Sequence, residues 1–241
     1  MVCQLKLKKA IIFDLGNTLV RYYDATEFPT ILGQCISEVG EYLRSIGVPF
    51  ASQLDLSARV EQENHESNDF KVRPLEERMA RIFQLDQEST NDELVSSMCR
   101  RFMKPIFARG RIYDEVLASL RELRLSGYRV GLVSNTSWGS PAFLWREELD
   151  RRGLSGYLDK AVFCRDVGWR KPDSRIFAFA LGELGVDAKE SVFVGDEPRW
   201  DVVGPKSVGM HPILIDREGR FGEEYPDAIH NLLGLAERLR D

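Results

Sequence analysis

Five short apolar runs, spread along the chain, constrain the fold more than any other feature of the sequence. Each is rich in Val, Ile, Leu or Phe, and none alternates cleanly between apolar and polar residues. Such runs are typical of strands that are covered on both faces, as in a parallel sheet. The runs are KKAIIFD (8–14), YRVGLVSN (128–135), KAVFC (160–164), SVFVGD (191–196) and HPILID (211–216).

Amphipathic patterns alternate with these runs in the second half of the chain. The stretch 113–127 places its apolar residues on one helical stripe and closes with Gly127, which suits the end of a helix. The stretches 172–185 and 226–240 show similar patterns. Strands that alternate with helices form right-handed βαβ units. The sequence therefore predicts an α/β fold with a doubly wound, Rossmann-like parallel sheet.

The interval after the first run breaks this alternation. Between Val20 and about Arg109 no run indicates a strand, and four helical patterns occur instead. The last of them follows Thr90 and Glu93, the pattern of a capping box. We therefore expect an all-α cap domain at 21–107, inserted after the first strand, with the α/β core formed by 1–20 and 108–241. The four patterns span 29–47, 52–65, 74–86 and 91–103.

Composition excludes several classes of protein. The net charge of −5 argues against a general nucleic-acid binder, which would show a basic surface. No run approaches the roughly 20 apolar residues of a membrane-spanning helix. Cys3, Cys35, Cys99 and Cys164 form no C-x-x-C pair, which favours a reducing compartment. We expect a cytoplasmic protein, a monomer or weak homodimer, that binds neither nucleic acid nor membranes.

Polar residues stand where the predicted strands end. Asp14, Ser134 and Asp196 each close an apolar run, and Lys171 and Asp201 follow at short distance from a strand end. Alone, each would be a turn former, a helix cap or a solvated lysine. In open α/β sheets, however, ligands bind beyond the carboxyl ends of the strands. Three carboxylates crowded there would repel one another unless cations were present, and Lys171 and Mg²⁺ would supply that charge.

In motif order and spacing, this set resembles the haloacid dehalogenase-like (HAD) hydrolase superfamily, in the phosphatase-like branch with a helical cap after the first strand. The resemblance covers nearly the whole chain. Its first motif is matched by Asp14 in FDLGNTL and its second by Ser134 in LVSNTS. Lys171 in GWRKPDSRIF matches the third motif, and Asp196 and Asp201 in VFVGDEPRWD match the fourth.

The resemblance implies a role for each matched residue. Asp14 would attack phosphorus and form an aspartyl-phosphate, which splits one difficult displacement into two easier ones. Ser134 would donate a hydrogen bond to the phosphoryl group, and Lys171 would offset its negative charge. The substrate would be a small phosphorylated molecule. The expected phosphate-binding residues are Asn17, Thr18 and Asn135, and the expected ligands of Mg²⁺ are Asp14, the carbonyl of Gly16, Asp196 and Asp201.

Gly16 departs from the family pattern. HAD phosphatases usually carry a second aspartate here, which protonates the leaving group and then activates water. Glycine can do neither, and it would be needed if its φ were positive or if another backbone passed close by. Three readings stay open: the leaving group needs little protonation, as in acyl or anomeric sugar phosphates; a cap residue supplies the proton (Asp24, Glu27 or His65); or turnover is slow or absent.

Two further functions compete with a phosphatase. Haloacid dehalogenases lack the second aspartate because a halide leaves without a proton, but they need no Mg²⁺ and generally lack the G-D-x-x-x-x-D pattern kept here. A catalytically weak or inactive protein that binds phosphate or a partner is the alternative of another class. Trp169 and Arg170, beside the third motif, have the better claim to the rim of the site. Lys71 and Arg73, in a loop of the cap, fit solvated basic residues better than contacts to a substrate.

Overall fold

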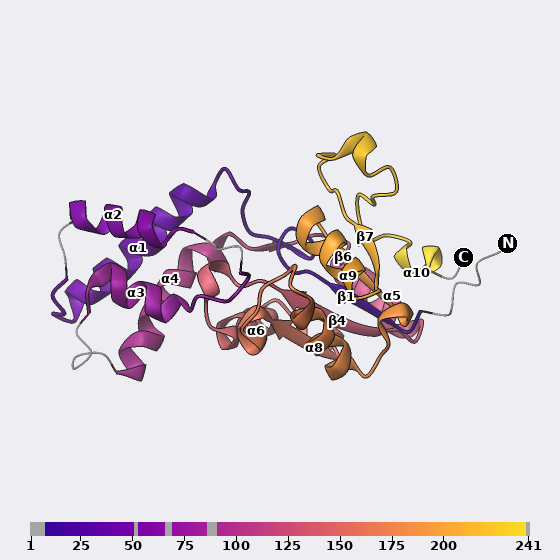
Figure 1. Cartoon of the computed structure of the whole chain (residues 1–241), viewed down its shortest axis with the longest axis horizontal. Coiled ribbons are helices and arrows are strands. Elements are labelled where there is room, and N and C mark those ends of the chain that lie inside the picture. The colour runs from indigo at the N-terminus through magenta and orange to yellow at the C-terminus, as the bar shows by residue number, and fades with distance from the viewer. Residues whose placement is uncertain (1–7, 51–52, 66–68, 86–90, 240–241) are drawn as a thin grey trace.

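The computed structural model describes residues 8–50, 53–65, 69–85 and 91–239. Among them, five parallel strands form one sheet in the order β5-β4-β1-β6-β7 (Figure 1). All five predicted strands are confirmed, and so is the α/β class. The strands are β1 (Ala10–Phe13), β4 (Arg129–Ser134), β5 (Lys160–Phe163), β6 (Ser191–Gly195) and β7 (His211–Leu214).

Helices cover both faces of this sheet, which explains why its strands are apolar throughout. Ile11 and Phe13 of β1 belong to one apolar cluster with α5 (Val116–Leu125) and α6 (Ala142–Arg151). Ile12 points the other way, into a second cluster with α8 (Ser174–Leu184). Successive residues of a strand face opposite sides. A strand between two helical layers therefore needs apolar residues at every position.

The register of the central strands determines which side chains meet at the carboxyl edge. Phe13 pairs with Leu132 of β4 on one side and with Val194 of β6 on the other. The residue after Phe13 is Asp14, whose N–H donates to the carbonyl of Val194 at 2.9 Å. Ser134 and Asp196 each lie two residues beyond the paired positions, so three polar residues converge at this edge.

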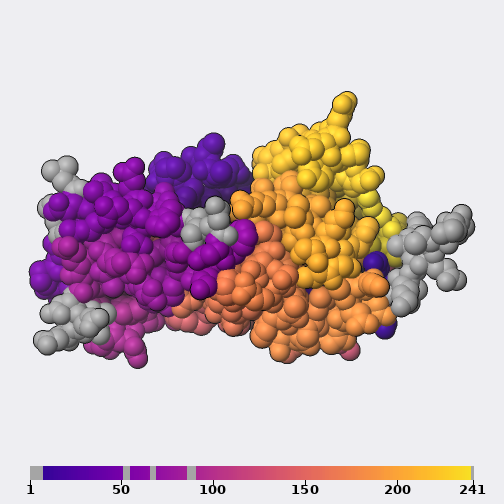
Figure 2. Space-filling view, viewed as in Figure 1, coloured from indigo at the N-terminus to yellow at the C-terminus, as the bar shows by residue number. Residues whose placement is uncertain are grey.

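Among the described residues, four helices occupy the interval between Val20 and Arg109, as predicted. They lie at one end of the molecule beside the α/β part (Figures 1 and 2). Their apolar residues belong to the same cluster as the α5 face of the sheet. The extent of a cap domain at 21–107 stays a prediction. The inserted helices are α1 (Phe28–Ser45), α2 (Gln53–Glu63), α3 (Leu75–Phe83) and α4 (Asp92–Arg109).

A short strand pair marks the place where the chain leaves for the inserted helices and returns. Val20 of β2 (Val20–Arg21) pairs antiparallel with Ile112 of β3 (Arg111–Ile112). Two-residue strands carry no recognisable pattern, so the sequence did not predict them. The start of α4 also differs, because Asn91 caps it by accepting from the N–H of Leu94 at 2.8 Å. Thr90 of the expected capping box lies outside the described residues.

The helix predicted at 226–240 is wrong over most of its length. Only α10 (Leu235–Arg238) is α-helical there. The N–H of Ile229 instead donates to Leu214 of β7 at 2.9 Å, and its carbonyl accepts from Asp216 at 2.7 Å. The edge of the sheet thus takes the backbone groups that a helix would need. Other short helices include α7 (Cys164–Val167), α9 (Gly204–Ser207) and the turn Pro198–Val203.

Three cysteines lie in the described part of the chain, and each is a buried free thiol: Cys35, Cys99 and Cys164. Cys3 lies outside it. None of the helices described has the length and apolar character that crossing a membrane requires.

Buried Glu148 of α6 joins the inserted helices to the α/β part. It is fully buried and accepts from Arg152 Nε at 2.5 Å. Arg152 in turn donates to the carbonyls of Phe107, in α4, at 2.8 Å and Gly110 at 2.9 Å. Removing one partner of a buried ion pair leaves an uncompensated charge.

We therefore expect Glu148→Ala to lower the free energy of unfolding by about 3 kcal/mol, as measured by urea denaturation. The matched control is Glu147→Ala, next to it in α6. Glu147 pairs with Arg100 of α4 on the surface, where both side chains are more than 40% exposed. That change should cost less than about 1 kcal/mol. Equal losses in the two variants would contradict a special role for the buried pair.

Candidate active site

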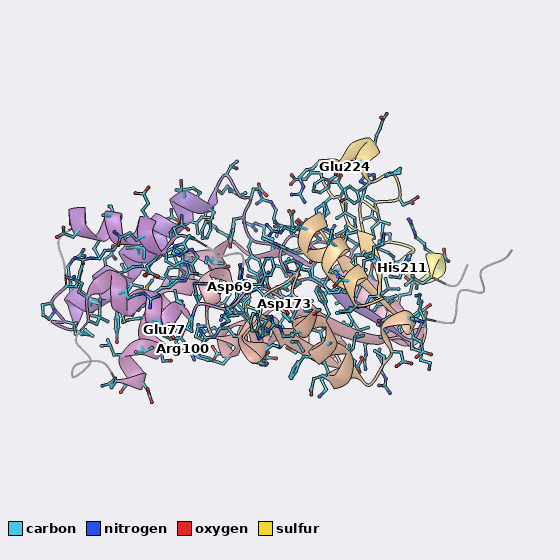
Figure 3. The ribbon with its side chains drawn as sticks, viewed as in Figure 1. Asp69, Glu77, Arg100, Asp173, His211 and Glu224 are labelled. Carbon is cyan, nitrogen blue, oxygen red and sulfur yellow. The ribbon has the colours of Figure 1, made fainter. Side chains whose placement is uncertain are left out.

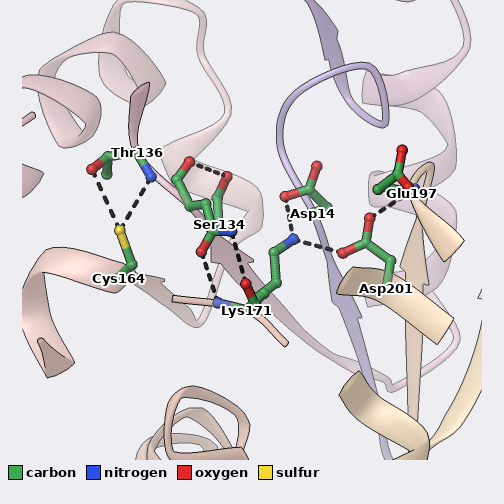
Figure 4. A network of polar contacts seen from close by, with 8 residues as sticks. Asp14, Ser134, Thr136, Cys164, Lys171, Glu197 and Asp201 are labelled. Carbon is green, nitrogen blue, oxygen red and sulfur yellow. Dashed lines mark hydrogen bonds and ion pairs between the residues drawn. The ribbon is translucent and has the colours of Figure 1, made fainter. Parts of the chain in front are cut away.

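The ammonium group of Lys171 lies between two carboxylates at the carboxyl edge of the sheet (Figure 4). Its Nζ donates to Asp14 Oδ1 at 2.6 Å and to Asp201 Oδ1 at 2.7 Å. Only 1% of the Lys171 and Asp201 side chains is exposed, and 10% of that of Asp14. The three predicted residues therefore form one buried, charge-paired group.

Asp201 reaches this group because of a glycine and a turn. A Cβ at Gly195 would lie 2.3 Å from Asp201 Cγ, so only glycine leaves room for this carboxylate beside β6. The second oxygen of Asp201 accepts from the N–H of Glu197 at 3.0 Å. The turn Pro198–Val203 thus presents Asp201 to the sheet edge with both of its oxygens bound.

Asp196 completes an acidic cluster with Asp14 and Asp201. Each of the three offers a carboxylate oxygen, and these oxygens lie within 4.8 Å of one another. Arg220 binds Asp196 through its carbonyl at 3.0 Å and through Oδ2 at 3.2 Å. Burial and the negative charges of Asp14 and Asp201 raise the pKa of Asp196 to about 8, far above its ordinary value of 3.8.

The pKa of Lys171 shows the opposite balance. Burial by itself would lower this pKa, but the carboxylates of Asp14 and Asp201 outweigh burial and hold it above its ordinary value. Lys171 is therefore cationic at neutral pH and offsets one negative charge of the cluster. The raised pKa of Asp196 shows that repulsion within the cluster persists in spite of Lys171 and Arg220.

These three carboxylates could hold a metal ion. Hard divalent cations such as Mg²⁺ prefer oxygen ligands, and all three side chains supply them. A bound cation would also remove the repulsion that raises the pKa of Asp196. The residues present thus fit a divalent metal by charge, by donor type and by spacing.

Ser134 and Asn135, at the end of β4, lie beside this group. The Oγ of Ser134 donates to the carbonyl of Asn135 at 3.2 Å, and the Ser134 side chain is nearly buried. The amide of Asn135 binds the backbone of Lys171, accepting from its N–H at 2.8 Å and donating to its carbonyl at 3.3 Å. Asn135 thus contacts Lys171 directly.

The geometry of the turn after Asp14 shows whether residue 16 must be a glycine. The residue in the left-handed region is Asn17, with φ of 53°, and Gly16 lies outside that region. A Cβ on Gly16 would meet no heavy atom of the described residues within 4 Å. Neither positive φ nor a close approach therefore requires a glycine there. The turn itself would accept a side chain at position 16.

Two predicted phosphate-binding residues differ in their surroundings. Asn17 donates to the carbonyl of Tyr23 at 3.3 Å, and its Oδ1 has no hydrogen-bond partner among the described residues. Thr18 is fully buried, and its carbonyl accepts from Arg217 at 2.7 Å. The Oδ1 atom is itself buried, but Asn17 is partly exposed and lines a cavity, so a ligand could reach this residue. The buried Thr18 side chain is not accessible in this way.

A cavity of about 230 Å³ opens beside Asp196. Asn17, Asp24 and Arg220 line it together with Tyr113 and Glu218, among others. Of the three proton donors considered for the cap, only Asp24 belongs to this lining.

The other two candidate proton donors are engaged elsewhere. Glu27 accepts from the N–H of Asp24 at 2.8 Å and from Arg21 at 3.4 Å. His65 is exposed and its Nδ1 lies 2.6 Å from the carbonyl of Gln62. Asp24 itself accepts from Arg21 at 3.0 Å.

The loop with Lys71 and Arg73 contacts the third motif. Val72 donates to the carbonyl of Gly168 at 3.0 Å, and Lys71 Nζ lies 5.6 Å from the ring centroid of Trp169. Arg73 pairs with Asp69, which Figure 3 shows at the junction of the helical and α/β parts. The basic residues of this loop are thus satisfied by the protein itself, and Trp169 packs against one of them.

Sequence reasoning missed Arg220 and Arg217. Both follow β7, in a segment without a helical or strand pattern. Arg217 bonds to Glu115 Oε1 at 2.7 Å, and Arg220 to Asp196. A lone arginine in a loop gives no signal of its contact, because the partners are 102 and 24 residues away along the chain.

Comparison with known proteins identifies the family. The family model for haloacid dehalogenase-like hydrolases matches residues 8–209, and the chain belongs to this family. A glyceraldehyde 3-phosphate phosphatase from Methanothermobacter thermautotrophicus is 36% identical over 112 residues, which cover 46% of this chain and 48% of the relative. An (S)-2-haloacid dehalogenase from Burkholderia cepacia is 32% identical over 52% of each chain. The chain thus spans about half the length of these curated relatives.

Solved structures agree over nearly the whole chain. A HAD phosphatase from Thermococcus onnurineus is 27% identical, with a TM-score of 0.63 over 96% of this chain and 97% of that one. A 2-haloacid dehalogenase from Pseudomonas syringae pv. Tomato reaches a TM-score of 0.69 at 23% identity, which shows a shared fold. Because both a phosphatase and a dehalogenase share the fold, the fold does not choose between these two chemistries.

The repulsion at Asp196 predicts a pH-dependent effect on stability. Because the pKa of Asp196 is raised to about 8, its carboxyl group stays protonated in the folded chain up to about pH 8. In the unfolded chain the same group loses its proton near pH 4. The free energy of unfolding should therefore fall, through this group, by up to about 1.4 kcal/mol for each pH unit between 4 and 8. Asp196→Asn should gain stability relative to the native chain as pH rises from 5 to 8, as urea denaturation in EDTA would show.

The control is Asp216→Asn. Burial would raise the pKa of Asp216, but N–H groups of Phe221 and Arg220 outweigh burial and hold it below its ordinary value. Asp216 is therefore ionised at both pH values, and its replacement should cost about the same at each. If Asp196→Asn lost as much stability at pH 8 as at pH 5, the carboxylates would not repel as described.

Proposed function

We propose that the protein is a Mg²⁺-dependent phosphatase that acts on a small phosphorylated metabolite through an aspartyl-phosphate at Asp14. The observation that carries this proposal is the pairing of Lys171 with Asp14 and Asp201, with Asp196 in the same cluster. A nucleophilic carboxylate next to a fixed cation suits attack on a phosphoryl group, which carries negative charge on several oxygens.

The acidic cluster favours a phosphatase over a dehalogenase. Displacing a halide from carbon also uses a nucleophilic carboxylate, but it brings no phosphoryl charge into the site and gives no role to a set of carboxylates that holds a cation. A phosphatase, by contrast, needs ligands for a cation that accepts the charge of the phosphoryl oxygens. Phosphatase names among the relatives, such as that of a phosphoserine phosphatase from Thermus thermophilus, agree with this choice.

Asp14, Lys171, Ser134 and Asn17 each have a role in the proposed reaction. Lys171 holds Asp14 Oδ1, which leaves Asp14 Oδ2 to attack phosphorus. The new bond joins that oxygen to phosphorus, and the bond from phosphorus to the leaving-group oxygen breaks. Water then cleaves the aspartyl-phosphate, which releases phosphate and restores Asp14. Ser134 and Asn17 offer hydrogen-bonding groups at this edge for the phosphoryl oxygens.

Mg²⁺ would be held by Asp14, Asp196 and Asp201 together with the carbonyl of Gly16. When bound, the ion supplies positive charge for the phosphoryl oxygens and for the crowded carboxylates. Arg220 orients Asp196 through two hydrogen bonds.

The leaving group would occupy the cavity beside Asp196. A volume of about 230 Å³ is below the usual range for drug-sized ligands, which favours a small metabolite. Gly16 removes the usual acid from this place. Asp24 lines the cavity, but its carboxylate is engaged by Arg21 at 3.0 Å. We therefore propose a substrate whose leaving group needs little protonation.

Loss of the nucleophile tests the mechanism. Asp14→Asn keeps the size of the side chain but removes the attacking oxygen, so turnover of the best substrate in a panel of phosphoesters should fall by at least about 10³-fold. Chelation of Mg²⁺ by EDTA should abolish the native activity, and added Mg²⁺ should restore it. Circular dichroism shows whether the variant is folded.

The outcome also separates the competing functions. Turnover of a haloacid in EDTA would place the protein with the dehalogenases. Binding of inorganic phosphate without turnover of any phosphoester would favour a binding protein. The monomeric or weakly dimeric state and the cytoplasmic location stay predictions.

Position 16 gives a second test. Without a resident acid, the rate should fall steeply from p-nitrophenyl and acyl phosphates to simple alkyl phosphates. Gly16→Asp restores a proton donor where the structure leaves room, and should raise turnover of alkyl phosphates by roughly 10²-fold relative to aryl phosphates. Gly16→Asn, of the same size but not an acid, is the control and should leave the ratio unchanged.

A native protein that hydrolyses alkyl and aryl phosphates equally fast would show that a donor is already present. Asp24→Asn then becomes the decisive variant, because Asp24 is the cap carboxylate that lines the cavity.

A further inference from the structure

The position of the Lys171 ammonium depends on how its backbone is held. Nζ contacts two carboxylates at 2.6 and 2.7 Å, yet the residue lies outside the strands of the sheet. A long side chain in a loop has many rotamers, and fixing one of them costs conformational entropy. Contacts that hold the backbone of Lys171 would therefore help to keep its ammonium group in place.

The side chain of Asn135 supplies such a restraint. Its Oδ1 accepts from the N–H of Lys171 at 2.8 Å, and its Nδ2 donates to the carbonyl of the same residue at 3.3 Å. One amide thus binds both backbone polar groups of Lys171. Asn135 directly follows β4, whose register with β1 is fixed by the central pairing of the sheet. The restraint is therefore anchored to the same strands that present Asp14.

The segment before Lys171 is held from the other side by the loop that precedes α3. The N–H of Arg170 donates to the carbonyl of Phe70 at 2.8 Å, and Val72 donates to Gly168. These bonds fix the approach of the segment but do not touch Lys171 itself. Among the contacts described, the two bonds from Asn135 are the ones that bind the backbone of Lys171.

We propose that Asn135 is a positioning residue for Lys171, which keeps the ammonium between Asp14 and Asp201. This differs from the phosphate-binding role expected from the sequence, because the amide oxygen and one amide N–H are already used by the Lys171 backbone. The catalytic consequence rests on the proposed function, but the position of Lys171 can be measured without any turnover.

The experiment compares Asn135→Ala with Asn135→Asp. Alanine removes both bonds to Lys171, whereas aspartate keeps the acceptor for its N–H and loses the donor. Lys171 is 1% exposed and ion-paired, so acetic anhydride should modify it very slowly in the native protein. In Asn135→Ala its acetylation should rise roughly tenfold, as expected for the loss of one or two hydrogen bonds, with a smaller rise in Asn135→Asp. Peptide mass mapping reads this rate relative to exposed Lys160.

Thr136→Val is the matched control. Thr136 is the next residue, is also buried, and its hydroxyl lies 3.4 Å from the Sγ of Cys164 rather than near Lys171. This variant tests whether any loss of packing in the loop exposes Lys171. It should leave the acetylation of Lys171 unchanged, even if the melting temperature falls.

Kinetics distinguish positioning from direct phosphate contact. A misplaced Lys171 should lower kcat by roughly 10²-fold in Asn135→Ala. If acetylation of Lys171 stays at the native rate while inhibition by inorganic phosphate weakens, Asn135 contacts phosphate and the positioning role is overturned. If acetylation rises but no phosphoester is turned over even by the native chain, the positioning role stands and the proposed function fails.

Discussion

The buried contact of Lys171 with Asp14 and Asp201 is the interaction on which the site depends. A buried ammonium group is costly unless opposite charges surround it, and the two carboxylates provide them at 2.6 and 2.7 Å. The same contact fixes the geometry of three segments that are far apart in sequence: the end of β1, the third motif and the turn after β6. A substitution that displaces one of these three side chains therefore disturbs the other two. This is why Gly195, which leaves room for Asp201, matters.

The remaining charge of the cluster connects structure with function. Burial raises the pKa of Asp196 to about 8, and the charges of Asp14 and Asp201 add to this in spite of Lys171 and Arg220. An arrangement that is unfavourable by itself suits a site that binds a cation and then a phosphoryl group. The same site lacks an acid at Gly16, although the backbone would accept one there. The geometry of the turn therefore does not explain the absence of that acid.

Local patterns predicted the elements well where neighbouring residues decide the structure. All five strands and the four inserted helices follow apolar runs or stripes that can be read directly from the sequence. The helix expected at 226–240 failed because Ile229 bonds to the edge of β7, a partner its own pattern does not reveal. In the turn after Asp14 the residue with positive φ is Asn17, and Gly16 meets neither of the two conditions that would require a glycine. Asparagine tolerates the left-handed region through its short polar side chain.

The sequence by itself determined the α/β class, the order of the strands along the chain, and the types of residue at their carboxyl ends. These follow from burial and from the period of the side chains, which are local properties. The tertiary structure alone decided that Asn135 binds the backbone of Lys171 and that Arg220 binds Asp196. It also decided that Asp24, rather than His65, lines the cavity beside Asp196. Contacts between distant segments depend on register and on the course of loops, and neither leaves a pattern in the residues that meet.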